Sequence, residues 1–293
     1  MSDLNVFKQP KAFYLIFSIE FWERFGFYGM QAILTVYLVQ ILGMSESTSF
    51  VLFGAFNALI YGLICGGGWV GDKILGTKRT ITLGAIFLAL GYVILGMSTT
   101  HMFSSNSIIY LAMGCISVGN GLFKANPSSL LAKVYDEVDP RLDGAFTMYY
   151  MAINLGSFIS MIITPIVAVK MGYGLAFGVS AVGLAITILN FIFCQYIVKG
   201  VGSPADARKL NITHLMLVIA GSIVMCFVSM YLLKHISVAH MALLVAGIAI
   251  IVLYMKDAFS ISGVERAKML VAFVLMMLQG IVFFIYTSKC QHR

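Results

Sequence analysis

Four ionisable residues lie inside long hydrophobic stretches of this 293-residue chain: Glu20, Glu23, Arg24 and Lys124. Such side chains are costly at membrane depth and usually face a bundle interior or a water-filled cavity, where they mark routes for ions or substrates. Glu20 and Glu23 could exchange a proton while Arg24 holds the neighbouring negative charge. Loading or releasing the proton would change whether Arg24 is free to bind an anionic group. The alternative is a static ion pair, whose only role is to let charged side chains lie within the bilayer.

The spacing of the first three residues places them on one side of a helix. At about 100° per residue, a single arc of about 140° holds a polar and aromatic set: Glu20, Glu23, Arg24, Phe27, Tyr28 and Gln31. Lys124 lies in a separate apolar stretch, where its ammonium could pair with a substrate carboxylate or with one of the two acids. Its long stem could instead reach the membrane interface near Lys133.

Tyr61 and Asn154 are two further polar residues in apolar stretches. Buried phenol and amide groups need hydrogen-bond partners, so each residue either ties helices together or contacts a ligand, and both alternatives stay open. The glycines within residues 62–68, and Gly156 with Ser157, are predicted to let neighbouring helices approach closely.

The elements that position these residues are predicted to be membrane-spanning helices. The chain is 60% hydrophobic and 11% charged, with a mean hydropathy of +0.95, whereas soluble domains carry about 25% charged residues. A soluble globular protein is therefore excluded, and the fold class is an all-α polytopic membrane protein. At about 20 residues per span, roughly nine helices fit, and the apolar stretches are 13–40, 50–71, 80–98, 107–131, 145–169, 174–198, 212–233, 238–255 and 268–287.

The net charge of +7 comes from residues between these stretches. Lys and Arg are enriched in cytoplasmic loops, and a cytoplasmic N-terminus leaves only Lys170, Lys234, Lys289 and Arg293 on the opposite side. A cytoplasmic N-terminus is therefore predicted. We expect the chain to contact the lipid bilayer and to bind no nucleic acid. Phosphate-binding glycine loops, metal-ligand spacings and nucleophile motifs are absent, so we expect no metal, no cofactor and no enzymatic activity.

Three motifs resemble the proton-dependent oligopeptide transporters, a branch of the major facilitator superfamily, and particularly its enterobacterial members. Residues 20–25 match the E-x-x-E-R-F signature of the first helix, and residues 68–79 match the superfamily loop between helices two and three. Residues 146–158 match the fifth-helix pattern that ends in N-x-G. The likeness covers nearly the whole chain to about Phe284.

The resemblance implies symport of protons with di- and tripeptides across a bacterial inner membrane, driven by the proton gradient. Phe27 replaces the first tyrosine of the family's Y-Y-G, and Gln31 replaces a basic residue that some members use as a gate. By motif position, the proton-coupling residues are Glu20, Glu23, Arg24 and Lys124. The peptide-binding residues are Arg24, Tyr28, Tyr61, Lys124, Asn154 and Gln279. The hinge contact of the loop involves Gly68, Asp72, Lys73, Gly76, Lys78 and Arg79.

The resemblance also implies an order of segments: a cytoplasmic N-terminus (1–11), a six-helix bundle (12–199), an inserted helix pair (200–257) and the start of the C-terminal bundle (258–293). The last apolar stretch corresponds to the seventh core helix, and after Tyr286 the likeness ends. Because alternating access uses two repeats around a central site, the alternative to a working symporter is a truncated chain without transport activity. Pairing of two copies is a further, weaker alternative.

Overall fold

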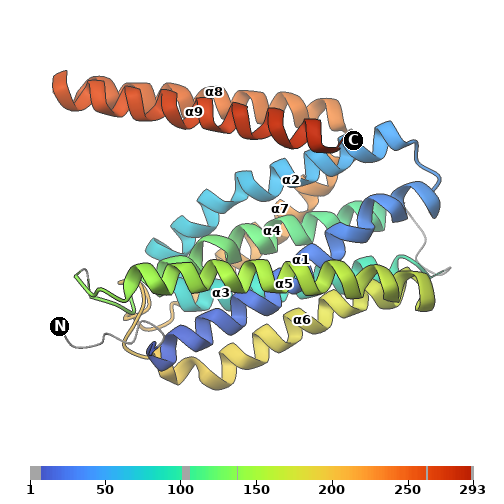
Figure 1. Ribbon diagram of the computed structural model, residues 1–293, viewed down its shortest axis with the longest axis horizontal. Coiled ribbons are helices and arrows are strands. Elements are labelled where there is room, and N and C mark those ends of the chain that lie inside the picture. The colour runs from blue at the N-terminus through green and yellow to red at the C-terminus, as the bar shows by residue number, and fades with distance from the viewer. Residues whose placement is uncertain (1–7, 101–105, 137, 262, 292–293) are drawn as a thin grey trace. The chain divides into compact units, whose positions relative to one another are not determined.

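The computed structural model describes residues 8–100, 106–136, 138–261 and 263–291. These residues form nine α-helices and no strand, which confirms the predicted fold class (Figure 1). The helices are α1 (Lys11–Gln40), α2 (Glu46–Trp69), α3 (Thr77–Met97), α4 (Asn106–Ala132), α5 (Leu142–Met171), α6 (Tyr173–Cys194), α7 (Ile212–Lys234), α8 (Ile236–Ser260) and α9 (Gly263–Gln291).

Six helices in the described residues are long and apolar enough to cross a membrane, namely α2, α3, α4, α5, α6 and α7. Helix α2 continues through a π-helical turn, Val70–Ile74, which lengthens this element to 29 residues. Helix α1 is as long as α5 at 30 residues, but it stands outside this group because charged side chains interrupt its apolar sequence.

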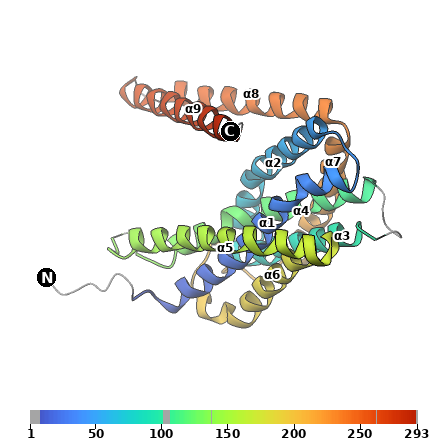
Figure 2. The same ribbon diagram turned by 45° about the vertical axis from the view of Figure 1, so that its right-hand side comes forward.

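The chain divides into two compact units, residues 1–239 and 240–293. In the first unit α1 packs against α5 and α6, α3 packs against α4 and α6, and α4 also contacts α2 and α7 (Figure 2). Its core consists of fully buried side chains from several helices, including Ile16, Leu34, Phe56, Leu88 and Ile116.

Several of these contacts depend on glycine. A Cβ on Gly84 of α3 would lie 2.7 Å from the Phe123 amide nitrogen of α4, and one on Gly156 of α5 would lie 2.6 Å from the Phe21 carbonyl of α1. A Cβ on Gly67 would collide with the Gly121 backbone of α4. The predicted packing role is therefore confirmed for Gly67 and Gly156. It is wrong for Gly62 and Gly66, around which there is open space.

In the second unit, α8 and α9 lie side by side (Figure 1). The Tyr254 hydroxyl donates a hydrogen bond to the Met269 carbonyl at 2.8 Å, and the Tyr254 and Phe273 rings stack at 4.8 Å. The division between the units falls within α8, whereas the resemblance places segment boundaries near 200 and 258, which stay predictions. Residues 1–7 of the expected cytoplasmic segment lie outside the described residues.

Candidate functional site

The centre of the site is an ion cluster on α1. The Arg24 side chain is fully buried; its Nε donates to the Glu23 carboxylate and lies 3.5 Å from Glu20 Oε1. Residues four apart are neighbours on a helix surface, so Glu20 reaches Arg24 from one turn away. The Phe27 ring covers the guanidinium at 4.9 Å. Glu20, Glu23 and Phe27 of the predicted polar and aromatic face therefore surround Arg24.

Two other helices complete this cluster. Asn120 of α4, which is buried, donates through Nδ2 to Glu23 Oε1 at 3.5 Å. Tyr149 of α5 lies beside Glu20 and is also buried. The close approach of α1 and α5 at Gly156 brings Tyr149 to this position. Sequence reasoning singled out neither Asn120 nor Tyr149.

Part of the cluster's hydrogen-bonding capacity is unused within the described part of the chain. Arg24 Nη1 and Nη2, Glu20 Oε2 and Asn120 Oδ1 are buried and have no partner there. A guanidinium offers five N–H donors; among the described residues only Nε donates a hydrogen bond within 3.5 Å, and Tyr28 lies near the guanidinium. Because buried polar groups are normally satisfied, this arrangement is typical of a site that receives another group, such as a proton on the carboxylate or an anion on the guanidinium.

Lys124 lies apart from the two carboxylates. Among the described residues it forms no ion pair within 4.0 Å, so the alternative in which Lys124 pairs with Glu20 or Glu23 is not seen, and pairing with a substrate carboxylate stays a prediction. Its ammonium instead lies 5.5 Å from the Tyr61 ring centroid, a distance suited to a cation–π contact. Tyr61 is 56% exposed, and Tyr28 and Lys124 are partly exposed. Whether the Lys124 stem reaches the membrane interface stays open; Lys133, nearer the end of α4, pairs with Asp72 at 3.2 Å.

Two other residues of the first unit lie outside this cluster. Gln31 donates to Asn57 of α2 at 2.7 Å and so ties α1 to α2. Asn154 is exposed on α5. Gln279 belongs to the second unit, where it is exposed on α9. The peptide-binding roles of Asn154 and Gln279 stay predictions.

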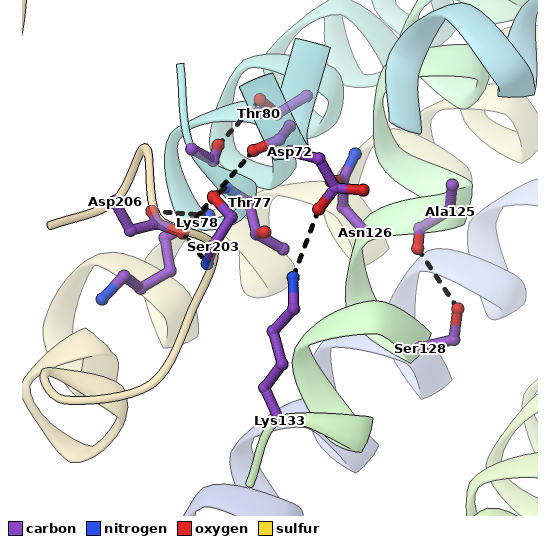
Figure 3. Close-up of polar contacts among 12 residues, drawn as sticks. Asp72, Thr77, Lys78, Thr80, Ala125, Asn126, Ser128, Lys133, Ser203 and Asp206 are labelled. Atoms are coloured by element: carbon purple, nitrogen blue, oxygen red, sulfur yellow. Dashed lines mark hydrogen bonds and ion pairs between the residues drawn. The ribbon is translucent and has the colours of Figure 1, made fainter. Parts of the chain in front are cut away.

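The loop that precedes α3 has a separate polar network (Figure 3). Gly76, at the N-terminal end of α3, has φ +97° and contributes no capping side chain. The Asp206 carboxylate takes that role, because it accepts hydrogen bonds from the Thr77 and Lys78 amides at 2.9 and 3.2 Å. Ser203 donates to the Gly71 carbonyl at 2.9 Å. Residues 198–208, which we call the strap, thus hold the start of α3.

Basic side chains of the loop add to this network. Lys78 donates to the Val198 carbonyl at 3.1 Å, and Arg79 donates to the Arg208 carbonyl at 3.0 Å. Gly68 packs against Ala125 of α4. Lys73 is exposed, and within the described ranges no hydrogen bond or ion pair involves its side chain. Of the predicted hinge residues, Lys78 and Arg79 therefore bind the strap, which sequence reasoning did not identify.

The loop after α4 holds two groups with altered pKa outside the helices. Tyr135 donates to Gln9 Oε1 at 2.6 Å, and burial raises the pKa of Tyr135 to about 12. Hydrogen bonds from Arg141 hold the pKa of the Asp139 carboxyl below its usual range. Both contacts stabilise the loop and lie away from the buried cluster.

A bundle of apolar helices around a buried set of opposite charges defines a multi-pass membrane protein. Comparison with known families gives a match to the POT family over residues 78–292. The chain belongs to the POT family. The match extends past Tyr286, where the likeness in motifs was expected to end, so that expectation is wrong.

Similar proteins include permeases of several bacteria. The chain is 56% identical over 286 residues to dipeptide and tripeptide permease A of Escherichia coli (strain K12), a match that covers 98% of this chain and 56% of that protein. It is also 56% identical to the permease of the same name from Chromobacterium violaceum, covering 98% and 57%. The chain therefore spans about half the length of these relatives.

Solved structures support the same fold. A crystal structure of tetrameric PepTSo2 superposes with a TM-score of 0.82 at 36% identity, over 94% of this chain and 59% of that one. A bacterial homologue of the human drug peptide transporters PepT1 and PepT2 gives 0.76 at 37% identity, over 85% and 57%. The predicted major facilitator fold is thus confirmed.

Proposed function

We propose that this chain takes part in proton-coupled symport of di- and tripeptides into the cytoplasm across a bacterial inner membrane. The observation that carries the proposal is the buried Arg24, which contacts two carboxylates through one edge and leaves Nη1 and Nη2 without a partner in the described residues. The similarity to dipeptide and tripeptide permeases supports it. The N-terminus is on the cytoplasmic side, and the proton gradient rather than a cofactor supplies the driving force.

In this proposal the charge on the cluster decides whether Arg24 is available. With both acids ionised, two negative charges stabilise the guanidinium, and a third anion is repelled. Protonation of Glu20 or Glu23 removes one of them, so Arg24 then attracts the carboxylate of a peptide. Burial strengthens this exchange, because charges interact more strongly away from water.

The remaining residues contact the peptide. Lys124 lies over Tyr61 with no acid within ion-pair distance among the described residues, so its charge is available to a second peptide group or to the coupling proton. Tyr28 and Asn154 supply hydrogen bonds. Gln279 is the remaining member of the peptide-binding set that the resemblance implies.

A second candidate function is peptide and proton binding without transport by this chain alone. The observation in its favour is that the chain spans 56% of the length of the Escherichia coli permease, while alternating access requires two repeats around the site. Two copies that pair would be a third arrangement.

Two measurements separate these proposals. Labelled dipeptide uptake is measured in vesicles that bear only this polypeptide, with and without an inward proton gradient, and peptide binding is measured on the solubilised chain. Gradient-driven accumulation above empty vesicles supports symport, whereas binding without accumulation supports the second candidate. Absence of both would refute the two proposals together.

The role of the cluster is tested with Glu23→Gln, which keeps the shape and removes the titrating group. If uptake is seen, this variant should lose its dependence on the gradient and retain peptide exchange. Glu46→Gln is the matched control, since Glu46 is an exposed acid in the first turn of α2. Unchanged driven uptake in Glu23→Gln would show that Glu23 does not couple the proton.

A further inference from the structure

A groove of about 440 Å³ lies between α2, α4 and α7 within the first unit. Its walls are apolar and include Leu63 of α2, Leu122 of α4, and Leu217 and Met225 of α7. Gly66 and Gly221 also line the groove, and a Cβ at either position would meet no atom within 4 Å. The groove is thus shaped by small and aliphatic residues from three helices.

One end of the groove is basic. Lys73 lines the groove and also a second pocket, of about 450 Å³, together with Lys133, Arg208 and Asp72. Three cations thus face one carboxylate, and that carboxylate is engaged with Lys133. Lys73 and the Arg208 side chain are exposed and form no ion pair in the described part of the chain. The pocket therefore has an excess of positive charge.

Two aromatic residues lie where the apolar groove approaches the basic pocket. Trp69, at the end of α2, is 61% exposed, and His214 lies in the first turn of α7. Trp is enriched at the level of lipid headgroups, which favours a position of this part of the groove at the membrane interface. The apolar walls then run from the interface into the hydrocarbon, and the cations lie on the aqueous side, which is the order of groups in a phospholipid.

We propose that the groove and the basic pocket together bind one anionic phospholipid. Its phosphate lies between Lys73 and Arg208, and one acyl chain lies along α2, α4 and α7. Loops rich in Lys and Arg mark this side as cytoplasmic, and basic pockets between helices on that side bind anionic headgroups. This site shares no residue with the ion cluster around Arg24, so it rests on the proposed orientation and not on peptide transport.

The proposal is tested by native mass spectrometry of the full detergent-solubilised chain, titrated with phosphatidylglycerol and with phosphatidylcholine of the same acyl chains. Each cation near an anionic headgroup is worth about fivefold in affinity. Lys73→Gln and Arg208→Gln should each weaken phosphatidylglycerol binding about fivefold and weaken phosphatidylcholine binding less, because the choline group of phosphatidylcholine already offsets the charge of its phosphate. Lys170→Gln is the matched control, because Lys170 is an exposed cation at the C-terminal end of α5.

The groove is tested separately with Gly221→Leu and Gly66→Leu. Both positions have room for a side chain, so the helices should form, and the added leucine should fill the groove and weaken binding of both lipids. Gly178→Leu on α6, which also has open space and does not line the groove, is the control. Unchanged binding in both groove variants would overturn the acyl-chain position.

Three other results would overturn the proposal. Equal affinity for the two lipids would show that the cations do not read the headgroup charge. Equally tight binding of glycerol phosphate would show a site for free phosphate rather than for a lipid. Self-association that phosphatidylglycerol does not displace would show that a second copy of the chain occupies the groove. If the chain binds phosphatidylglycerol but shows no gradient-driven peptide uptake, that result would contradict the proposed symport and leave the lipid site standing.

Discussion

The Asp206→Ala variant tests whether the strap holds α3. Asp206 accepts from three backbone amides, those of Thr77, Lys78 and Ser203. Loss of a helix cap costs about 1 kcal/mol, and a hydrogen bond to a charged group contributes about 1.5–3 kcal/mol. Because Asp206 is partly exposed, we take the low end of this range, about 1.5 kcal/mol, for each of its two hydrogen bonds to α3 amides. The expected loss in the free energy of unfolding is therefore about 3 kcal/mol.

The assay is thermal unfolding of the solubilised chain. At about 2–4 °C per kcal/mol for a unit of this size, Asp206→Ala should lower Tm by about 6–12 °C. Asp206→Asn keeps one carbonyl oxygen as an acceptor, so its effect should be about half as large. Asp136→Ala is the control, since Asp136 is exposed in a loop and its carboxylate has no partner among the described residues; about 0.5 kcal/mol or less is expected. Equal Tm values for Asp206→Ala and Asp136→Ala would refute the capping role.

Three further predictions concern helix packing, titration and a surface ion pair. Gly67→Ala should destabilise the chain by about 3 kcal/mol in chemical denaturation, because the added methyl group meets the α4 backbone. Gly62→Ala, in open space on the same helix, should be neutral or stabilising by about 0.5–1 kcal/mol. Equal effects of the two substitutions would contradict the packing of α2 on α4. Because burial raises the pKa of Tyr135 to about 12, the free energy of unfolding should fall as the pH rises from about 10 through 12. The phenolate absorbance that the unchanged chain shows and Tyr135→Phe lacks should titrate near pH 12 rather than near 10. Asp72→Asn should cost less than about 1 kcal/mol in thermal unfolding, because its pair with Lys133 is exposed, and a larger loss would show a buried role.

The ion cluster shows how far local spacing leads. Glu20 and Arg24 are four residues apart on one helix, so their contact follows from helix geometry alone and was predictable. The lack of hydrogen-bond partners for Arg24 Nη1 and Nη2 among the described residues was not predictable, because it depends on which groups α4 and α5 bring to the cluster. The contact of Lys124 with the Tyr61 ring was not predictable either, since it is set by the packing of α2 on α4; the role of Lys124 in proton and peptide binding stays a prediction.

The sequence by itself determined the membrane class, the all-α fold and the charged face of α1, because long apolar stretches and helical periodicity are local properties of the chain. Tertiary structure alone decided that Asp206 caps a helix that begins 129 positions earlier, and that Lys73 joins an apolar groove to a basic pocket. Such contacts join residues from separate helices and loops, and hydropathy carries no signal for them. The physical reason is that helix packing, set by where glycines permit close approach, fixes which side chains meet.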